Sequence, residues 1–123
     1  MKYMLVLRAS EPARDFAQDE AERRAMTAYD ERLIRAGVLL AGERLDPGAA
    51  VLVSCDGERR SVSDDGGRDT TPPIAMWMLQ VASSEEAVEW AKRCPASGGC
   101  MEVRRIVERS DTGAQHGAIG GAR

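Results

Sequence analysis

The 123-residue sequence predicts a single α+β domain, with a ferredoxin-like antiparallel sheet and two helices on one face of that sheet. The length fits one domain. Apolar residues recur with the period of a strand or of a helix, in the order strand, helix, three strands, helix, strand. Clusters of glycine, proline and aspartate separate these segments, as turns require.

The first half of the chain begins with a predicted strand at residues 2–8, whose two faces are both apolar. Helical spacing of apolar residues follows from residue 13 to residue 36, with Ser10 as a potential N-cap. Gly37 ends that helix, because glycine readily adopts the positive φ found just after helices. The segment 38–45 is not counted as a strand.

The second half begins with a predicted hairpin, because Asp56-Gly57 suits a tight turn between two strands. Ser83 and Glu86 have the spacing of a capping box at a helix start. We expect Ala87, Val88, Ala91 and Cys94 to face the core from that helix. The predicted elements are strands 50–55, 58–63, 74–82 and 101–108, and a helix from residue 84 to about residue 94. The domain spans residues 1–108, and residues 109–123 form a flexible tail.

A second subunit is expected from the pattern of the two most apolar strands, 2–8 and 74–82. Two helices on one side of a sheet leave its other face uncovered, and a solvated face should alternate with polar residues. Both faces of these strands are apolar instead. We therefore predict a homodimer in which the sheets of two copies pack on each other.

Composition argues against several classes of protein. The net charge of −3 disfavours a nucleic-acid partner, and no apolar run is long enough to cross a membrane. Three irregularly spaced cysteines fit reduced thiols in the cytoplasm better than a disulfide framework or a metal site. We expect no metal and no cofactor.

Four regions of the chain resemble one family in the same order. They are Met1–Leu5, the stretch 36–45 with Ala-Gly-Val-Leu and Gly-Glu-Arg-Leu, the helix 85–95, and Glu102-Val103-Arg104. Together they resemble the bacterial YCII-related, or DGPF-domain, family over residues 1–108. The resemblance implies a dimeric α/β barrel built from ferredoxin-like units. Members of the DGPF branch are often associated with extracytoplasmic-function sigma factors and have no established reaction.

The sequence departs from the family pattern at several places, among them Arg105 in the last strand, where the family tends to have Pro. The namesake loop reads Asp65-Gly66-Gly67-Arg68, so that Gly67 and Arg68 stand where the family has Pro and Phe. Some relatives carry a histidine near the end of the first strand, paired with an aspartate as a proposed catalytic dyad, whereas this chain has Arg8 there. An activity resting on that dyad is therefore not expected.

A pocket for a small polar or anionic ligand is the predicted site. Glu43 follows an apolar run, so we expect it to be half-buried and to need an arginine partner, either Arg8 or Arg104. A structural ion pair at the rim of the barrel is the alternative interpretation of these charges. The residues predicted to bind the ligand are Tyr3, Arg8, Glu43, Met76, Trp77 and Arg104.

Two functions fit these observations. The first is a ligand-binding or regulatory module, with a protein partner as a further expectation because no intact catalytic constellation is visible. The second is a cofactor-free lyase, isomerase or oxygenase, in which Asp65 or Glu43 is the base and Arg8 or Arg104 holds an anion. The second hypothesis depends on analogy of fold, which is weak support for a reaction.

Overall fold

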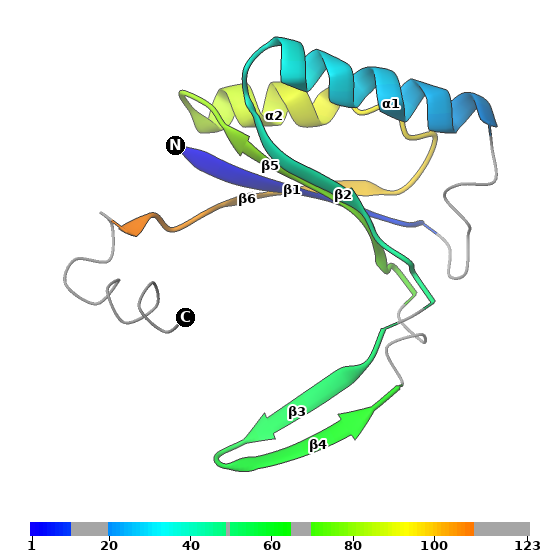
Figure 1. The fold of residues 1–123 in the computed structure, drawn as a ribbon, viewed down its shortest axis with the longest axis vertical. Coiled ribbons are helices and arrows are strands. Elements are labelled where there is room, and N and C mark those ends of the chain that lie inside the picture. The colour runs from blue at the N-terminus through cyan, green and yellow to red at the C-terminus, as the bar shows by residue number, and fades with distance from the viewer. Residues whose placement is uncertain (11–19, 49, 65–69, 110–123) are drawn as a thin grey trace.

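The computed structural model describes residues 1–10, 20–48, 50–64 and 70–109. Its main sheet has four antiparallel strands in the order β2-β5-β1-β6, and both helices lie on one face of it (Figure 1). This α+β, ferredoxin-like architecture confirms the predicted fold class. The elements are β1 (Lys2–Arg8), α1 (Glu20–Arg35), β2 (Leu39–Arg44), β3 (Leu52–Asp56), β4 (Arg59–Ser63), β5 (Pro73–Gln80), α2 (Ser84–Lys92) and β6 (Cys100–Arg105).

The core lies between the helices and the sheet. Alternate residues of the central strands β1 and β5 are fully buried there, because successive side chains of a strand point to opposite faces. From these strands the core receives Tyr3, Leu5, Leu7, Ala75, Trp77 and Leu79. The face of the sheet that carries no helix is called the open face below. Its central side chains are the half-buried Met4, Val6, Met76 and Met78.

Helix α1 packs on the sheet through Met26, Tyr29 and Leu33, whose spacing places them on one side of the helix. The helix ends as predicted at Gly37, which has a φ of 75°. The predicted start of the helix, between residues 13 and 19, lies outside the described residues.

Helix α2 begins with the predicted capping box. The Glu86 amide donates to the Ser83 hydroxyl at 3.1 Å, and the Glu86 carboxylate accepts from the Ala82 amide at 3.0 Å. The prediction that Val88 faces the core is wrong, since its side chain is 39% exposed. Trp90 is buried instead, because Ala87, Trp90 and Ala91 share the side of the helix that meets the sheet.

The structure contains an edge strand, β2, that is missing from the predicted order of elements. Residues 39–44 were not expected to form a strand, yet they pair with β5 and complete the main sheet. Their pattern of burial does not alternate, and the register shifts between Leu39 and Ala41, so the sequence lacks the signal of a strand here. Strand β6 ends at Arg105, earlier than the predicted residue 108.

The two strands predicted at 50–55 and 58–63 are present, but they do not join the main sheet. β3 and β4 pair only with each other, around the predicted turn, where Gly57 has a φ of 61°. The hairpin projects from the end of the main sheet toward the side of the open face (Figure 1). Residues 110–123, which hold most of the predicted tail, lie outside the described residues. Among the parts that are described, no helix is both long and apolar enough to cross a bilayer.

Candidate functional site

Charged side chains flank the apolar centre of the open face. Directly opposed residues of paired strands share a face, so the register gives the arrangement. Across the four strands, Glu43 lies opposite Met76, Met76 opposite Val6, and Val6 opposite Glu102. In the neighbouring row, Arg104 of β6 lies opposite Met4, which lies opposite Met78. The open face therefore has a centre of methionine and valine with charges along both edges.

An ion cluster of Arg8, Glu102 and Arg104 occupies the β6 side of this face. The Glu102 carboxylate accepts from Arg104 Nη2 at 2.9 Å and lies 3.5 Å from Arg8 Nε. The hydrogen bond from Arg104 and the charges of both arginines lower the pKa of Glu102, and the same hydrogen bond raises the pKa of Arg104. Arg8 also donates to the Thr71 carbonyl at 3.1 Å. Among the described residues, two guanidinium groups share this one carboxylate.

The structure divides the predicted ligand-binding residues between the two faces of the sheet. Arg8, Met76 and Arg104 lie on the open face, and Glu43 lies on it at the edge strand β2. Tyr3 and Trp77 are buried on the opposite face, under the helices. Met76 and Trp77 are neighbours in one strand, so their side chains cannot line the same side of the sheet. A single pocket lined by all six residues is therefore not formed within the subunit.

The structure also corrects the prediction that Glu43 pairs with Arg8 or Arg104. Glu43 is exposed rather than half-buried, and it makes no ion pair or hydrogen bond with a described residue. Arg8 and Arg104 bind Glu102 instead, because strand β6 places Glu102 beside both of them, whereas Glu43 is two strands away from β1. The other candidate base, Asp65, lies outside the described residues.

Trp77 is held by a network that the sequence did not reveal. Its Nε1 donates to Asp30 Oδ1 at 2.7 Å, and Arg44 Nη2 binds Asp30 Oδ2 at 2.8 Å. The Arg44 guanidinium lies 5.3 Å from the centre of the Trp77 ring, and the Tyr29 ring meets that ring edge-on at 5.4 Å. Gly42 lies opposite Trp77, and a Cβ there would come within 3.0 Å of Trp77 Cδ1. The sequence feature that points to this network is Asp30, which directly follows the core residue Tyr29.

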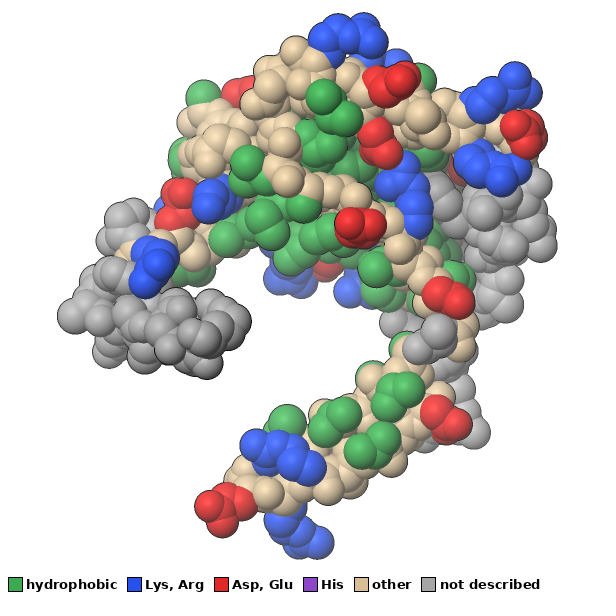
Figure 2. Space-filling model, viewed as in Figure 1, with side chains coloured by type: hydrophobic (Ala, Val, Ile, Leu, Met, Phe, Trp, Pro, Cys, Tyr) green, Lys and Arg blue, Asp and Glu red, His purple; other side chains and the backbone are tan. Residues whose placement is uncertain are grey.

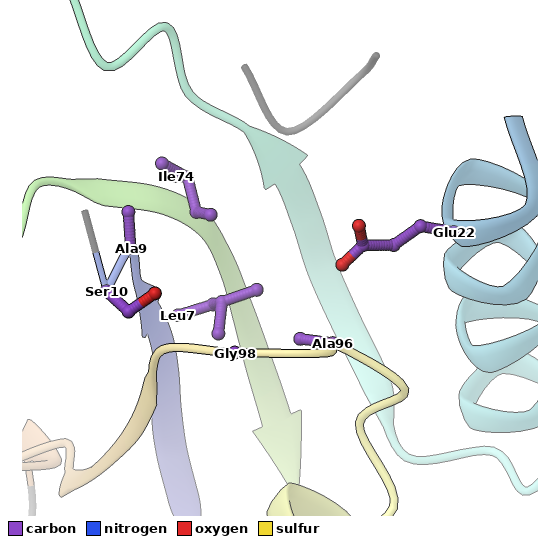
Figure 3. Close-up of a pocket in the computed structure, with 7 residues that line it drawn as sticks. All are labelled: Leu7, Ala9, Ser10, Glu22, Ile74, Ala96 and Gly98. Atoms are coloured by element: carbon purple, nitrogen blue, oxygen red, sulfur yellow. The ribbon is translucent and has the colours of Figure 1, made fainter. Parts of the chain in front are cut away.

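Two cavities lie at the end of the sheet near residues 96–99. The first, shown in Figure 3, has a volume of about 10 Å³, enough for a single water molecule. Its lining residues are Leu7, Ala9, Ser10, Glu22, Ile74, Ala96 and Gly98. The Glu22 carboxylate reaches this end of the sheet and accepts from the Ser97 amide at 3.3 Å. This first cavity has no room for an organic ligand.

The second cavity is a shallow hollow of about 260 Å³ beside Cys94 and the loop 96–100. Burial raises the pKa of the Cys94 thiol, which makes it a poor nucleophile at neutral pH. Neither cavity is lined by Arg8, Glu43 or Arg104. Within the described ranges, no three His, Cys, Asp or Glu side chains come together as metal ligands would.

Comparison with known proteins gives one result that bears on identity. A family model described as the YCII-related domain matches residues 1–110, and no curated protein matches the chain. The match covers the described sheet and both helices and agrees with the resemblance in the four sequence regions. Its span, together with the ferredoxin-like order of the strands, places the chain in the YCII-related family.

Proposed function

We propose that this YCII-related protein is a cytoplasmic homodimeric binding module, which holds a small polar or anionic ligand beside the charged rim of the open face. The observation that carries the proposal is the composition of that face. Met4, Val6, Met76 and Met78 form a continuous apolar centre, and both helices lie on the other side of the sheet. A second sheet packed about 10 Å away would remove this centre from water.

The chemistry of the ligand follows from the charges beside that centre. The Arg104 side chain stays 67% exposed beside Glu102, so its guanidinium is accessible to an anion. Guanidinium groups recognise carboxylate and phosphate through paired hydrogen bonds. Packing of a second sheet over the face would exclude water from the cluster and strengthen this attraction.

Sedimentation velocity over a range of concentrations tests the dimer. The wild type is expected to sediment with the mass of two chains, and Met76→Asp is expected to shift the particle toward one chain, because it places a charge in the apolar centre. Val88→Asp, which places the same charge at an exposed position of α2 on the other side of the sheet, is the matched control. A folded wild type with the mass of one chain at every concentration would refute the dimer.

Thermal denaturation with a panel of carboxylates and phosphates tests the ligand. A ligand present at about 100 times its Kd adds about 2.7 kcal/mol to the free energy of unfolding. For a compound that stabilises the wild type, Arg104→Ala should weaken binding about tenfold or more. Arg105→Ala, the adjacent residue on the other face of β6, should leave binding within about twofold, since an exposed charge at the wrong face contributes little. Equal losses in both variants would contradict the assigned site.

If the binding module is regulatory, its ligand is a protein. The resemblance to the DGPF branch suggests that this partner is a sigma factor. Binding measured directly between the purified chain and a sigma factor encoded beside its gene would test it. The absence of a complex at micromolar concentrations, together with a stabilising small molecule, would favour the ligand over the protein partner.

The enzyme hypothesis retains one supporting observation. Glu43 lies on the same face as Arg8 and Arg104, and its carboxylate makes no hydrogen bond to a described residue. A second copy would bring the two edges of the open face into one enclosed space, in which Glu43 is the base and an arginine holds the anion. Turnover of a small-molecule mixture, followed by mass spectrometry, should disappear in Glu43→Gln. Turnover that survives this change would remove Glu43 from the mechanism.

A further inference from the structure

The β3–β4 hairpin exposes apolar side chains that no described residue of the main sheet or helices covers. Its residues 50–63 are called the arm below. All residues of β3 are exposed, and so are those of β4 except the half-buried Ser63. Val51, Val53 and Val62 are 60%, 55% and 72% exposed. A two-stranded hairpin by itself is marginally stable in water, so the arm is expected to pack on something else.

The arm has one apolar face and one polar face. Val53 lies opposite Val62 and Cys55 lies opposite Arg60, so these side chains share a face, on which Val51 also lies by alternation. The other face carries Ser54, Ser61, Ser63, Asp56 and Arg59, beside Leu52. This alternation is typical of an antiparallel ribbon with one side covered and one side in water.

The arm and the open face border the same empty space. The arm follows β2 and leads back to β5, and it extends below the sheet on the side without helices (Figure 1). The space-filling view shows a wide gap between the arm and the sheet, with hydrophobic side chains on both (Figure 2). Two apolar surfaces of one chain therefore face a common space without touching each other.

Symmetry and charge both favour a second copy of the chain as the occupant of that space. A two-fold related copy presents the same two surfaces, so one association covers both open faces and both arms. The charges agree with this choice. The charged residue on the apolar face of the arm is Arg60, and the open face offers the carboxylate of Glu43, which has no partner among the described residues.

We propose that the arm packs its apolar face, Val51, Val53, Cys55 and Val62, against a second copy of this chain, and that each open face is completed by the arm of the other subunit. The inference rests on the sheet-on-sheet dimer proposed above and adds the element that closes it. The arm brings Arg60 toward Glu43 at the β2 edge of the open face, so the surroundings of this candidate base are incomplete in one subunit.

The dimer dissociation constant of two adjacent variants tests the arm. Val62→Asp places a charge on its apolar face, and Ser61→Asp places the same charge on its polar face. We expect Val62→Asp to raise the dissociation constant at least about tenfold, because each substitution occurs twice in the dimer, and Ser61→Asp to change it by less than about threefold. If Met76→Asp dissociates the dimer while Val62→Asp does not, the arm is refuted and the sheet-on-sheet dimer stands.

Photo-crosslinking of the wild-type sequence gives a second measurement, which does not depend on the folding of a variant. Photoreactive methionine replaces methionine in the chain, and unlabelled and ¹⁵N-labelled subunits are mixed before irradiation. We expect products that join Met76 or Met78 of one isotope to residues 50–63 of the other. Products confined to one isotope would show that the arm folds onto its own sheet, and they would overturn the inference. The absence of any product between the arm and the open face would also overturn it.

Discussion

Replacing Asp30 by alanine removes the acceptor that fixes Trp77 in the core. The Trp77 side chain has no exposed surface, and its Nε1 donates to Asp30 at 2.7 Å. A buried donor that loses its acceptor costs about 1–3 kcal/mol. The ion pair between Asp30 and Arg44 is about one-third exposed, so solvent screening limits its contribution to about 0.2–1 kcal/mol. We therefore expect Asp30→Ala to lower the free energy of unfolding by about 2.5 kcal/mol.

Urea unfolding followed by circular dichroism measures this loss at one fixed protein concentration, because dimerisation makes stability depend on concentration. Glu31→Ala, at the next and exposed residue of α1, is the control and should stay within about 0.5 kcal/mol of the wild type. In a double-mutant cycle, Asp30→Ala and Trp77→Phe should couple by at least about 1 kcal/mol. A loss below about 0.5 kcal/mol for Asp30→Ala, or additive effects in the cycle, would refute the assigned role of the network.

Three further outcomes follow from other parts of the described structure. Gly99→Ala should destabilise the protein by about 2 kcal/mol or more in the same assay, because φ is 96° there and a Cβ would strike the Arg8 carbonyl oxygen. An effect below about 0.5 kcal/mol would contradict that contact. Glu102 has a lowered pKa, so its stabilising effect is present at neutral pH and is lost as the pH falls through that lowered pKa. The difference in unfolding free energy between the wild type and Glu102→Gln should accordingly shrink between pH 7 and pH 3, and a constant difference would contradict the ion cluster. Cys94 should react with iodoacetamide more slowly in the native protein than in urea-unfolded protein, as followed by peptide mass spectrometry, because burial raises its pKa. Equal rates in native and urea-unfolded protein would contradict the burial of Cys94.

The candidate site shows where prediction from sequence succeeded and where it failed. Arg8 and Arg104 were predicted to belong to one site, and β1 and β6 carry them on one face, although β6 is an edge strand. Their carboxylate partner was missed, because Glu43 and Glu102 are equivalent as isolated side chains and only the pairing of β6 with β1 selects Glu102. Trp77 was assigned to a ligand pocket, although its position beside Met76 in an alternating strand already placed it on the other face.

The same contrast applies to β2. Its sequence, Leu-Leu-Ala-Gly-Glu-Arg, has no regular alternation, and a register shift interrupts its pairing. Glycine at position 42 lets β2 pack beside Trp77, because the Trp77 ring occupies the space that a larger side chain would need. A contact between residues 35 positions apart in the chain cannot be inferred from the period of either segment.

The amino-acid sequence by itself determined the features that depend on near neighbours. These are the alternation of β1 and β5, the capping box of α2, the helix end at Gly37 and the turn at Gly57. Only the tertiary structure decided which strands share a sheet, which acid the arginines bind, and that the hairpin stands apart as an arm. The physical reason is range: periodicity and capping act over a few residues, whereas strand pairing and ion-pair choice depend on segments that meet only after the chain has folded.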